Sequence, residues 1–226
     1  MRNVGFLTIG QAPRHDISEA IERALPESSA VRHAGALDGL GRTEIADRFA
    51  VASGRPTLIT RLTSGDVVTL DEAAMQEALQ ESIDTLDSEG VDAIVLLCTG
   101  DFPSLRSQRA LLIEPDVLVT SYVSAVLRGL PVGVIVPLPE QVPAARDKWQ
   151  GVSPPPEFAT ASPYADDDAE LLTAAKKLVE HGARALVLDC MGYADRHRKA
   201  LREGGVAVPV LTSSGITGAL TGPLLT

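Results

Sequence analysis

The segment GVDAIVLLCTG at residues 90–100 aligns without a gap with the segment GARALVLDCMG at residues 182–192. The two segments share Gly, Ala, Val, Leu, Cys and Gly at the same offsets, and each contains one of the chain's two cysteines, Cys98 and Cys190. Each segment follows a stretch with helical periodicity, and a Val-Gly pair opens an earlier apolar run in each half of the chain. The pattern indicates two related halves, each with a cysteine at the end of an apolar strand.

Short apolar runs rich in β-branched residues alternate along the chain with amphipathic stretches of helical period. The apolar runs end at turn residues and are typical of buried parallel strands. These strands are predicted at Val4–Ile9, Ala93–Leu97, Val132–Val136, Ala185–Leu188 and Val206–Leu211. The amphipathic stretches at 71–88 and 166–181 predict helices. Because strands that alternate with helices form βαβ units, we predict an α/β fold of two pseudo-symmetric parallel-sheet halves with helices on both faces.

The same pattern divides the chain into units. Residues 1–115 are predicted to form the first half and residues 116–212 the second, with residues 213–226 as a C-terminal helix that packs back on the first half. Near residues 57–70 we predict an inserted β-hairpin, because Ser-Gly-Asp at 64–66 separates two short extended runs. An active cleft is expected between the halves, since ligands of parallel sheets collect beyond the carboxyl ends of the strands.

Composition and charge narrow the classes of function. Hydrophobic residues make up 45% of the chain and charged residues 22%, which is typical of a globular protein. The formal net charge is −10 and no basic run stands out, so nucleic acid is not an expected partner. No apolar stretch reaches the roughly 18 residues of a membrane helix, and the N-terminus does not resemble a signal peptide. We therefore expect a cytoplasmic protein without a membrane partner.

In a reducing cytoplasm the two cysteines are expected to act as thiols rather than as a lasting disulfide. The four histidines show no recognisable ligand spacing, so we expect no metal site. His15 and His197 lie on polar, helix-like segments and are expected at the solvent-exposed surface. A single cysteine at the end of an apolar strand is often a core residue. A matched pair at equivalent strand ends favours a functional site instead.

Two thiols on opposite sides of one cleft meet the needs of a racemase. Such an enzyme removes a proton from the carbon beside a carboxylate and returns a proton to the other face, which takes a base and an acid on opposite sides. A thiol can serve in either role once a helix N-terminus or a polar neighbour lowers its pKa. One carbon between two such contacts predicts a distance of roughly 7 to 8 Å between the two Sγ atoms.

The turns at the strand ends supply candidate substrate-binding groups. The loops that follow the cysteines each contain a glycine, which lets backbone N–H groups approach an anion. The turn after the first strand offers an amide and a cation, and the turn after the last strand offers hydroxyl groups at a predicted helix start. The candidate substrate-binding residues are Gln11, Arg14, Thr99, Gly100, Asp101, Met191, Gly192, Tyr193, Ser213 and Ser214.

Three motifs resemble those of the AroM family: TIGQAPRHD at residues 8–16, CTGDF at 98–102 and LDCMGY at 188–193. The resemblance spans nearly the whole chain. The AroM family is itself similar in fold to the aspartate/glutamate/hydantoin racemase superfamily, in which each of two α/β halves brings a cysteine to the cleft. The resemblance implies an acid/base enzyme without a cofactor that acts on a small carboxylate or cyclic amide, with Cys98 and Cys190 as its catalytic pair.

The residues around the cysteines depart from the racemase pattern. Thr99 follows the first cysteine where racemases commonly have Asn, Gln11 belongs to a Gly-Gln pair in place of Asp-Ser or Asp-Gly, and Asp189 replaces a small residue. These departures argue against amino-acid substrates. Beside a racemase or epimerase, two alternatives stay open: a lyase or hydrolase in which one thiol reacts and the other tunes it, and a binding protein without turnover. The sequence also leaves a homodimer open.

Overall fold

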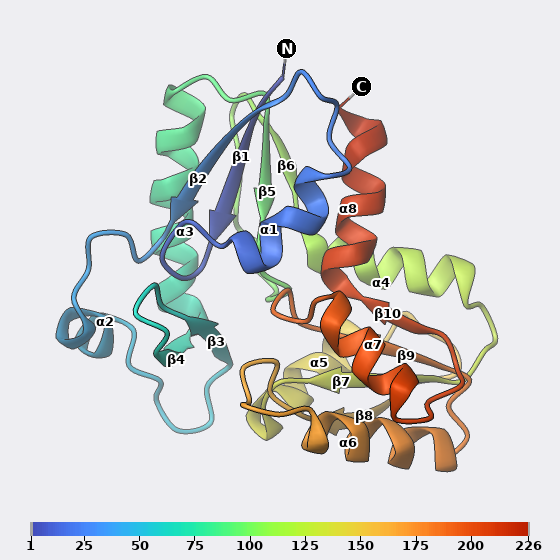
Figure 1. Cartoon of the computed structure of the whole chain (residues 1–226). Coiled ribbons are helices and arrows are strands. Elements are labelled where there is room, and N and C mark those ends of the chain that lie inside the picture. Colours follow the sequence, from blue (N-terminus) through green and yellow to red (C-terminus); the bar gives the residue numbers. More distant parts are fainter. Residues whose placement is uncertain (1, 226) are drawn as a thin grey trace.

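The computed structural model describes residues 2–225 and contains two four-stranded parallel sheets (Figure 1). The first sheet has the strand order β2-β1-β5-β6, and the second has the order β8-β7-β9-β10. The strands are β1 (Asn3–Thr8), β2 (Ala30–Gly35), β5 (Ala93–Leu96), β6 (Leu111–Ile113), β7 (Val132–Val136), β8 (Glu157–Thr160), β9 (Ala185–Leu188) and β10 (Val210–Thr212). The predicted α/β fold of two parallel-sheet halves is therefore confirmed.

The two sheets repeat not only the order of their strands but also their register. Val4 of β1 lies opposite Ala93 of β5, and Val132 of β7 lies opposite Ala185 of β9. These valines and alanines are the ones that the two halves of the sequence share. The repeated segments therefore occupy the same place in both sheets.

A glycine follows each of these valines, and packing explains it. A Cβ atom on Gly5 would lie 3.2 Å from Leu86, and a Cβ atom on Gly133 would lie 2.9 Å from Leu178. Both leucines come from helices that pack on the sheets, α3 (Glu72–Ser88) and α6 (Ala169–Glu180). Because glycine has no side chain, it lets each helix approach its sheet closely.

Helices cover both faces of each sheet and enclose four clusters of buried apolar side chains. In the first half α3 covers one face and α1 (His15–Glu22) covers the other, while in the second half α6 covers one face and α4 (Pro115–Val126) covers the other. The remaining helices are α2 (Arg42–Arg48), η1 (Pro139–Gln141), α5 (Val142–Lys148), α7 (Asp195–Glu203) and α8 (Ser213–Leu224).

Two of these helices cross between the halves. Helix α4 follows the last strand of the first sheet, yet its Val119 and Val123 belong to a core cluster of the second half. Helix α8 follows the last strand of the second sheet and runs along α1 of the first half (Figure 1). Each half thus contributes a helix to the other. The unit boundaries at residues 115 and 212 stay predictions.

A two-stranded antiparallel hairpin precedes α3. Its strands are β3 (Thr57–Arg61) and β4 (Val67–Asp71), and the turn between them contains Gly65 at φ +91°. The carboxylate of Asp71 accepts a hydrogen bond from the Ala74 N–H at 3.0 Å and so caps α3. The hairpin therefore fixes where α3 begins.

The structure also contains three strands that the sequence analysis missed, namely β2, β6 and β8. These strands lie at the edges of the sheets. Polar residues interrupt β2 and β8, and β6 has only three residues, so none of them forms a long apolar run. The predicted strand at Val206–Leu211 is wrong at its start, because β10 begins only at Val210. Pro209 stands before it and has no N–H to donate to a neighbouring strand.

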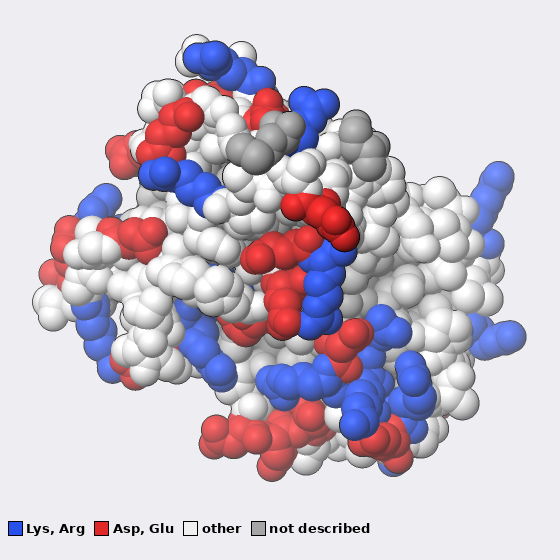
Figure 2. All heavy atoms as spheres, turned by 45° about the horizontal axis from the view of Figure 1, so that its top comes forward, with Lys and Arg blue, Asp and Glu red and all other residues white. Residues whose placement is uncertain are grey.

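Charged side chains of both signs are interspersed on the face shown in Figure 2, where Lys and Arg lie among Asp and Glu.

Within residues 2–225, none of the helices combines the length and the apolar character needed to span a bilayer.

Candidate active site

A cavity of about 560 Å³ lies between the two halves, and both cysteines line it. Cys98 comes directly after Leu97 at the end of β5, and Cys190 comes after Asp189 at the end of β9. Further lining residues come from the ends of β1 and β7, from the hairpin, from α1, α3, α4 and α5, and from the loop that contains Tyr164. The equivalent strand ends of the two halves thus meet at one cavity.

The two thiols accept equivalent hydrogen bonds from their own loops. Sγ of Cys98 accepts a hydrogen bond from the Gly100 N–H at 3.3 Å, and Sγ of Cys190 accepts one from the Gly192 N–H at 3.4 Å. In each loop, an N–H two residues after the cysteine therefore favours the thiolate. A Cβ atom on Gly192 would lie only 2.7 Å from the hydroxyl of Tyr164, so a side chain there would collide with that tyrosine.

Burial sets the pKa of both thiols and affects them unequally. Burial raises the pKa of Cys98 far above its ordinary value, and the Gly100 N–H offsets only part of this. Burial raises the pKa of Cys190 to about 11, and the negative charge of Asp189 adds to the shift, while the Gly192 N–H and the positive charges of Arg14 and Lys148 favour the thiolate. Cys190 therefore ionises at a lower pH than Cys98. Of the two, Cys190 is the one more readily present as a thiolate, and Cys98 is the one that stays protonated.

Lys148 connects the two cysteine loops. Its Nζ donates hydrogen bonds to the backbone carbonyl of Thr99 at 2.9 Å and to the carboxylate of Asp189 at 2.8 Å. The same carboxylate accepts a hydrogen bond from the indole N–H of Trp149 at 2.7 Å. Asp189 is thus a buried, paired acid. The sequence analysis did not identify Lys148, because no local pattern around it indicates this role.

Arg14 lies at the edge of the cavity with its donors occupied. It forms a bidentate contact with Asp16, with both N···O distances at 2.8 Å, and donates to the Thr60 hydroxyl at 3.1 Å. Its guanidinium also lies 3.4 Å from the hydroxyl of Tyr164. Arg14 is therefore anchored. Its positive charge acts on the cavity, but its guanidinium N–H groups already have hydrogen-bond partners. Tyr164 is a second lining residue that the sequence analysis missed.

One side of the cavity is acidic. Glu72, Asp101 and Asp116 line it, and burial raises the pKa of Glu72 to about 7, with the negative charge of Asp101 adding to the shift. Burial also raises the pKa of Asp116. Glu72 is the first residue of α3, directly after the capping Asp71. An Asp that follows a predicted strand and precedes a predicted helix is typical of a helix N-cap. This pattern at Asp71 could have indicated that Glu72 begins the helix at the strand ends, where the site lies.

Six of the predicted binding residues line the cavity, and four do not. The six are Arg14, Thr99, Gly100, Asp101, Met191 and Gly192. Outside the lining, Gln11 uses both ends of its amide on Leu40 and Thr63. The remaining three are the buried residues Tyr193, Ser213 and Ser214. Their hydroxyl groups donate to the backbone carbonyls of Ala161, Leu188 and Tyr193, respectively.

The expectation that His197 is exposed is wrong. Its exposed fraction is 2%, and its ring packs edge-on against Tyr193 with 5.2 Å between the ring centroids. Nδ1 accepts a hydrogen bond from the Ala194 N–H at 2.9 Å, so this side chain caps α7 from inside the protein. The neighbouring residues in the sequence are polar, so the sequence did not indicate that this side chain points into the protein. His15, in contrast, is exposed as expected.

A model of the family described as AroM protein matches residues 4–225 of this chain. No curated protein matches its sequence. Among solved structures, allantoin racemase from Klebsiella pneumoniae aligns with a TM-score of 0.68 at 16% identity, over 100% of this chain and 88% of the racemase.

Two further solved structures share this fold. An unliganded arylmalonate decarboxylase has a TM-score of 0.62 at 15% identity and covers 100% of this chain and 92% of its own. Glutamate racemase from Aquifex pyrophilus has a TM-score of 0.61 at 12% identity and covers 99% of this chain and 84% of its own. The fold of this chain is therefore the one found in these racemases and in this decarboxylase, and the low identities carry no activity over to it.

Proposed function

We propose that this chain, which belongs to the AroM family, is a cofactor-independent racemase or epimerase with Cys98 and Cys190 as its acid/base pair. The observation that carries the proposal is that both thiols line one cavity from equivalent loops of the two halves. The fold shared with allantoin racemase and glutamate racemase supports it.

In the proposed reaction, the thiolate of Cys190 removes a proton from a carbon beside a carbonyl group. The electron pair of the broken C–H bond moves toward the carbonyl oxygen. Cys98 then gives its thiol proton to the opposite face of the carbon, which inverts the configuration. Cys98 leaves the cycle as a thiolate and Cys190 as a thiol, and exchange of protons with water restores the starting state. The unequal pKa values of the two thiols favour this assignment of base and acid.

The charges of the cavity favour a neutral cyclic amide over a dicarboxylate as the substrate. Its lining contains two cationic side chains, Arg14 and Lys148, and both already pair with carboxylates, those of Asp16 and Asp189. The acidic residues of the lining are Glu72, Asp101, Asp116, Asp147 and Asp189. A second carboxylate on the substrate would meet this negative charge, whereas a cyclic amide would donate N–H groups to it.

Hydrogen exchange in deuterated water tests the proposal. The protein is incubated with one enantiomer of a cyclic ureide such as allantoin, and separately with one enantiomer of aspartate and one of glutamate. Mass spectrometry measures the deuterium that enters each compound, and polarimetry measures its optical rotation. We expect deuterium incorporation and loss of rotation with the cyclic amide. Cys98→Ser and Cys190→Ser should each lower racemisation by at least about a hundredfold, while circular dichroism shows that both variants are folded. Racemisation that survives either substitution would refute the two-thiol mechanism.

A thiol-dependent lyase is the second candidate, because the two thiols are unequal and the fold also occurs in arylmalonate decarboxylase. In such an enzyme only one thiol delivers a proton, to the carbanion left by loss of CO2. Release of CO2 from an arylmalonate that depends on one cysteine and tolerates serine at the other would favour the lyase. A requirement for both cysteines favours the racemase.

A further inference from the structure

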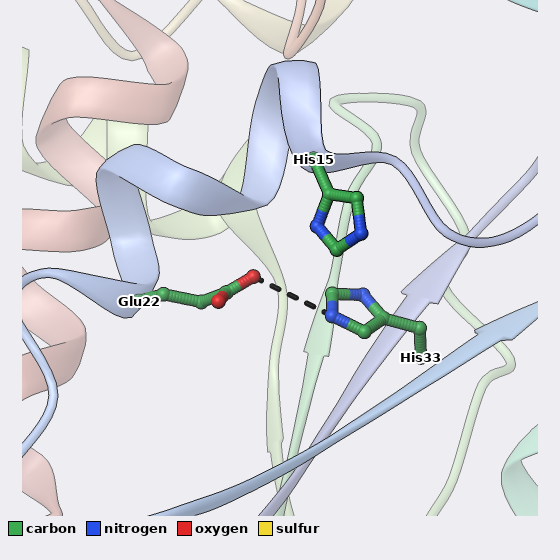
Figure 3. Close-up of side chains that lie close together, drawn as sticks. All are labelled: His15, Glu22 and His33. Carbon is green, nitrogen blue, oxygen red and sulfur yellow. Dashed lines mark ion pairs between the residues drawn. The ribbon is translucent and has the colours of Figure 1, made fainter.

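Three potential metal ligands lie together at the outer edge of the first half (Figure 3). His15 and Glu22 come from the two ends of α1, and His33 comes from β2. Each offers one ligand atom, and the three atoms lie within 4.8 Å of one another. The two imidazole rings and the carboxylate point toward a common space in the close-up view. None of the three residues lines the cavity that holds the cysteines.

The polar atoms of this cluster are not fully paired. Nε2 of His33 lies 3.5 Å from Oε1 of Glu22, a distance at the limit of a hydrogen bond. Oε1 of Glu22, which faces the His33 ring, is shielded from solvent and has no hydrogen-bond partner among residues 2–225. Buried polar atoms are nearly always paired, so unpaired ones point to a missing partner.

The surroundings hold His33 in place and leave a path from solvent. Its ring stacks on Phe6 at 5.8 Å between centroids and meets the ring of His15 edge-on at 5.0 Å. The side chains of His33 and Glu22 keep exposed fractions of 19% and 30%, and His15 is exposed. The cluster is therefore held in place by aromatic packing and stays open to solvent.

We propose that His15, Glu22 and His33 bind one divalent transition-metal ion such as Zn²⁺, with water at the remaining position. Two imidazoles and one carboxylate form a ligand set that zinc accepts, and imidazole ligands favour Zn²⁺, Co²⁺, Ni²⁺ and Cu²⁺ over Mg²⁺ and Ca²⁺. Tetrahedral bonds of about 2.0 to 2.1 Å place ligand atoms roughly 3.3 Å apart, so atoms that now lie up to 4.8 Å apart must approach by up to roughly 1.5 Å. Rotation of the exposed His15 side chain can supply this movement.

A bound ion would link α1 to the edge strand β2. Arg14 precedes His15 and lines the cavity, so this link would also fix the position of the start of α1 beside the cavity. The proposal revises the sequence-based expectation of no metal site. The cluster is independent of the proposed racemase reaction, since neither cysteine belongs to it.

Titration of the full chain with ZnCl2 and CoCl2 tests the site. The protein is purified without a polyhistidine tag, treated with EDTA and dialysed. Isothermal titration calorimetry then counts the Zn²⁺ ions bound, and the visible spectrum of Co²⁺ reports its ligands. The test variants are His15→Ala, which changes an exposed side chain, and His33→Gln, which keeps a polar side chain of similar reach. The controls are His181→Ala, in a histidine that pairs with Glu157 elsewhere, and the double variant Cys98→Ser/Cys190→Ser.

We expect one Zn²⁺ per chain and a rise in Tm on binding. His15→Ala and His33→Gln should each weaken the affinity by more than about tenfold, since loss of a second-shell group alone already costs that much. The His181 variant and the cysteine-free variant should bind as the wild type does. Absence of binding would overturn the proposal. Binding that survives in both test variants, or that is lost in the cysteine-free variant, would overturn it too.

Discussion

At the scale of the residue, the two cysteines have equivalent positions but unequal environments. Each Sγ accepts a hydrogen bond from the N–H of a glycine two residues later. Cys98 is buried, whereas Cys190 is partly exposed and senses the positive charge of Arg14 in addition to that of Lys148, which acts on both thiols. A repeat in sequence thus produces two thiols that ionise at different pH.

The pKa of Cys190 predicts how the activity depends on pH. Because this pKa is raised to about 11, the thiolate that acts as the base is scarce at pH 7 and increases about tenfold with each unit of pH below 11. We therefore expect kcat/KM for deuterium exchange to rise with a slope close to one between pH 7 and pH 10. A profile without this rise over the same range would contradict the role of Cys190 as the base.

At the scale of the element, close packing of α8 on α1 joins the end of the chain to the first half. A Cβ atom on Gly218 would lie 3.0 Å from the carbonyl oxygen of Ala20, and a Cβ atom on Gly222 would lie 2.3 Å from that of Ala24. These two glycines are one turn apart on α8. The helices approach each other closely only because no side chain stands between them.

Gly222→Ala is expected to lower the free energy of unfolding by about 1 to 3 kcal/mol, because the added methyl group forces α8 away from the backbone of the turn that follows α1. Denaturant unfolding followed by circular dichroism measures this. Gly151→Ala is the matched control, since a Cβ atom at Gly151 has no atom within 4 Å. Equal stability of the two variants would show that α8 does not need this close approach.

At the scale of the whole molecule, Lys148 holds the two cysteine loops together. Its ammonium group contacts the Thr99 carbonyl on the first half and the Asp189 carboxylate on the second. The exposed fractions of the Lys148 and Asp189 side chains are 13% and 1%. Removing one partner of such a pair leaves the other charge buried and uncompensated.

Lys148→Met should therefore lower the free energy of unfolding by about 3 to 5 kcal/mol. Lys199→Met is the matched control, because Lys199 and Glu203 form an ion pair whose side chains are 76% and 67% exposed. That change should cost less than about 1 kcal/mol. Addition of Asp189→Asn to the Lys148 variant should recover part of the loss, and thermal unfolding of the wild type, the Lys148→Met and Asp189→Asn single variants and their double variant measures the coupling. No recovery would argue that packing, rather than the uncompensated charge, causes the loss.

The elements that the sequence predicted best are the central strands. The strands β5, β7 and β9 are buried along their whole length, so their residues form continuous apolar runs. The edge strands β2, β6 and β8 depend on pairing with a neighbour for their structure, and their own residues give a weak signal. Loops that follow the central strands were predicted to line the site, and the cavity contains both of the cysteine loops.

The sequence by itself determined the two-halved α/β fold and the equivalent positions of Cys98 and Cys190, because strand periodicity, helix periodicity and the repeat are local patterns. Only the tertiary structure decided which charges surround the thiols. Lys148 reaches across 49 residues to Thr99 and 41 residues to Asp189. The potential ligands His15, Glu22 and His33 follow no metal-binding spacing and converge only when α1 packs beside β2. Contacts between residues so far apart depend on how the elements pack, and no window of sequence contains that information.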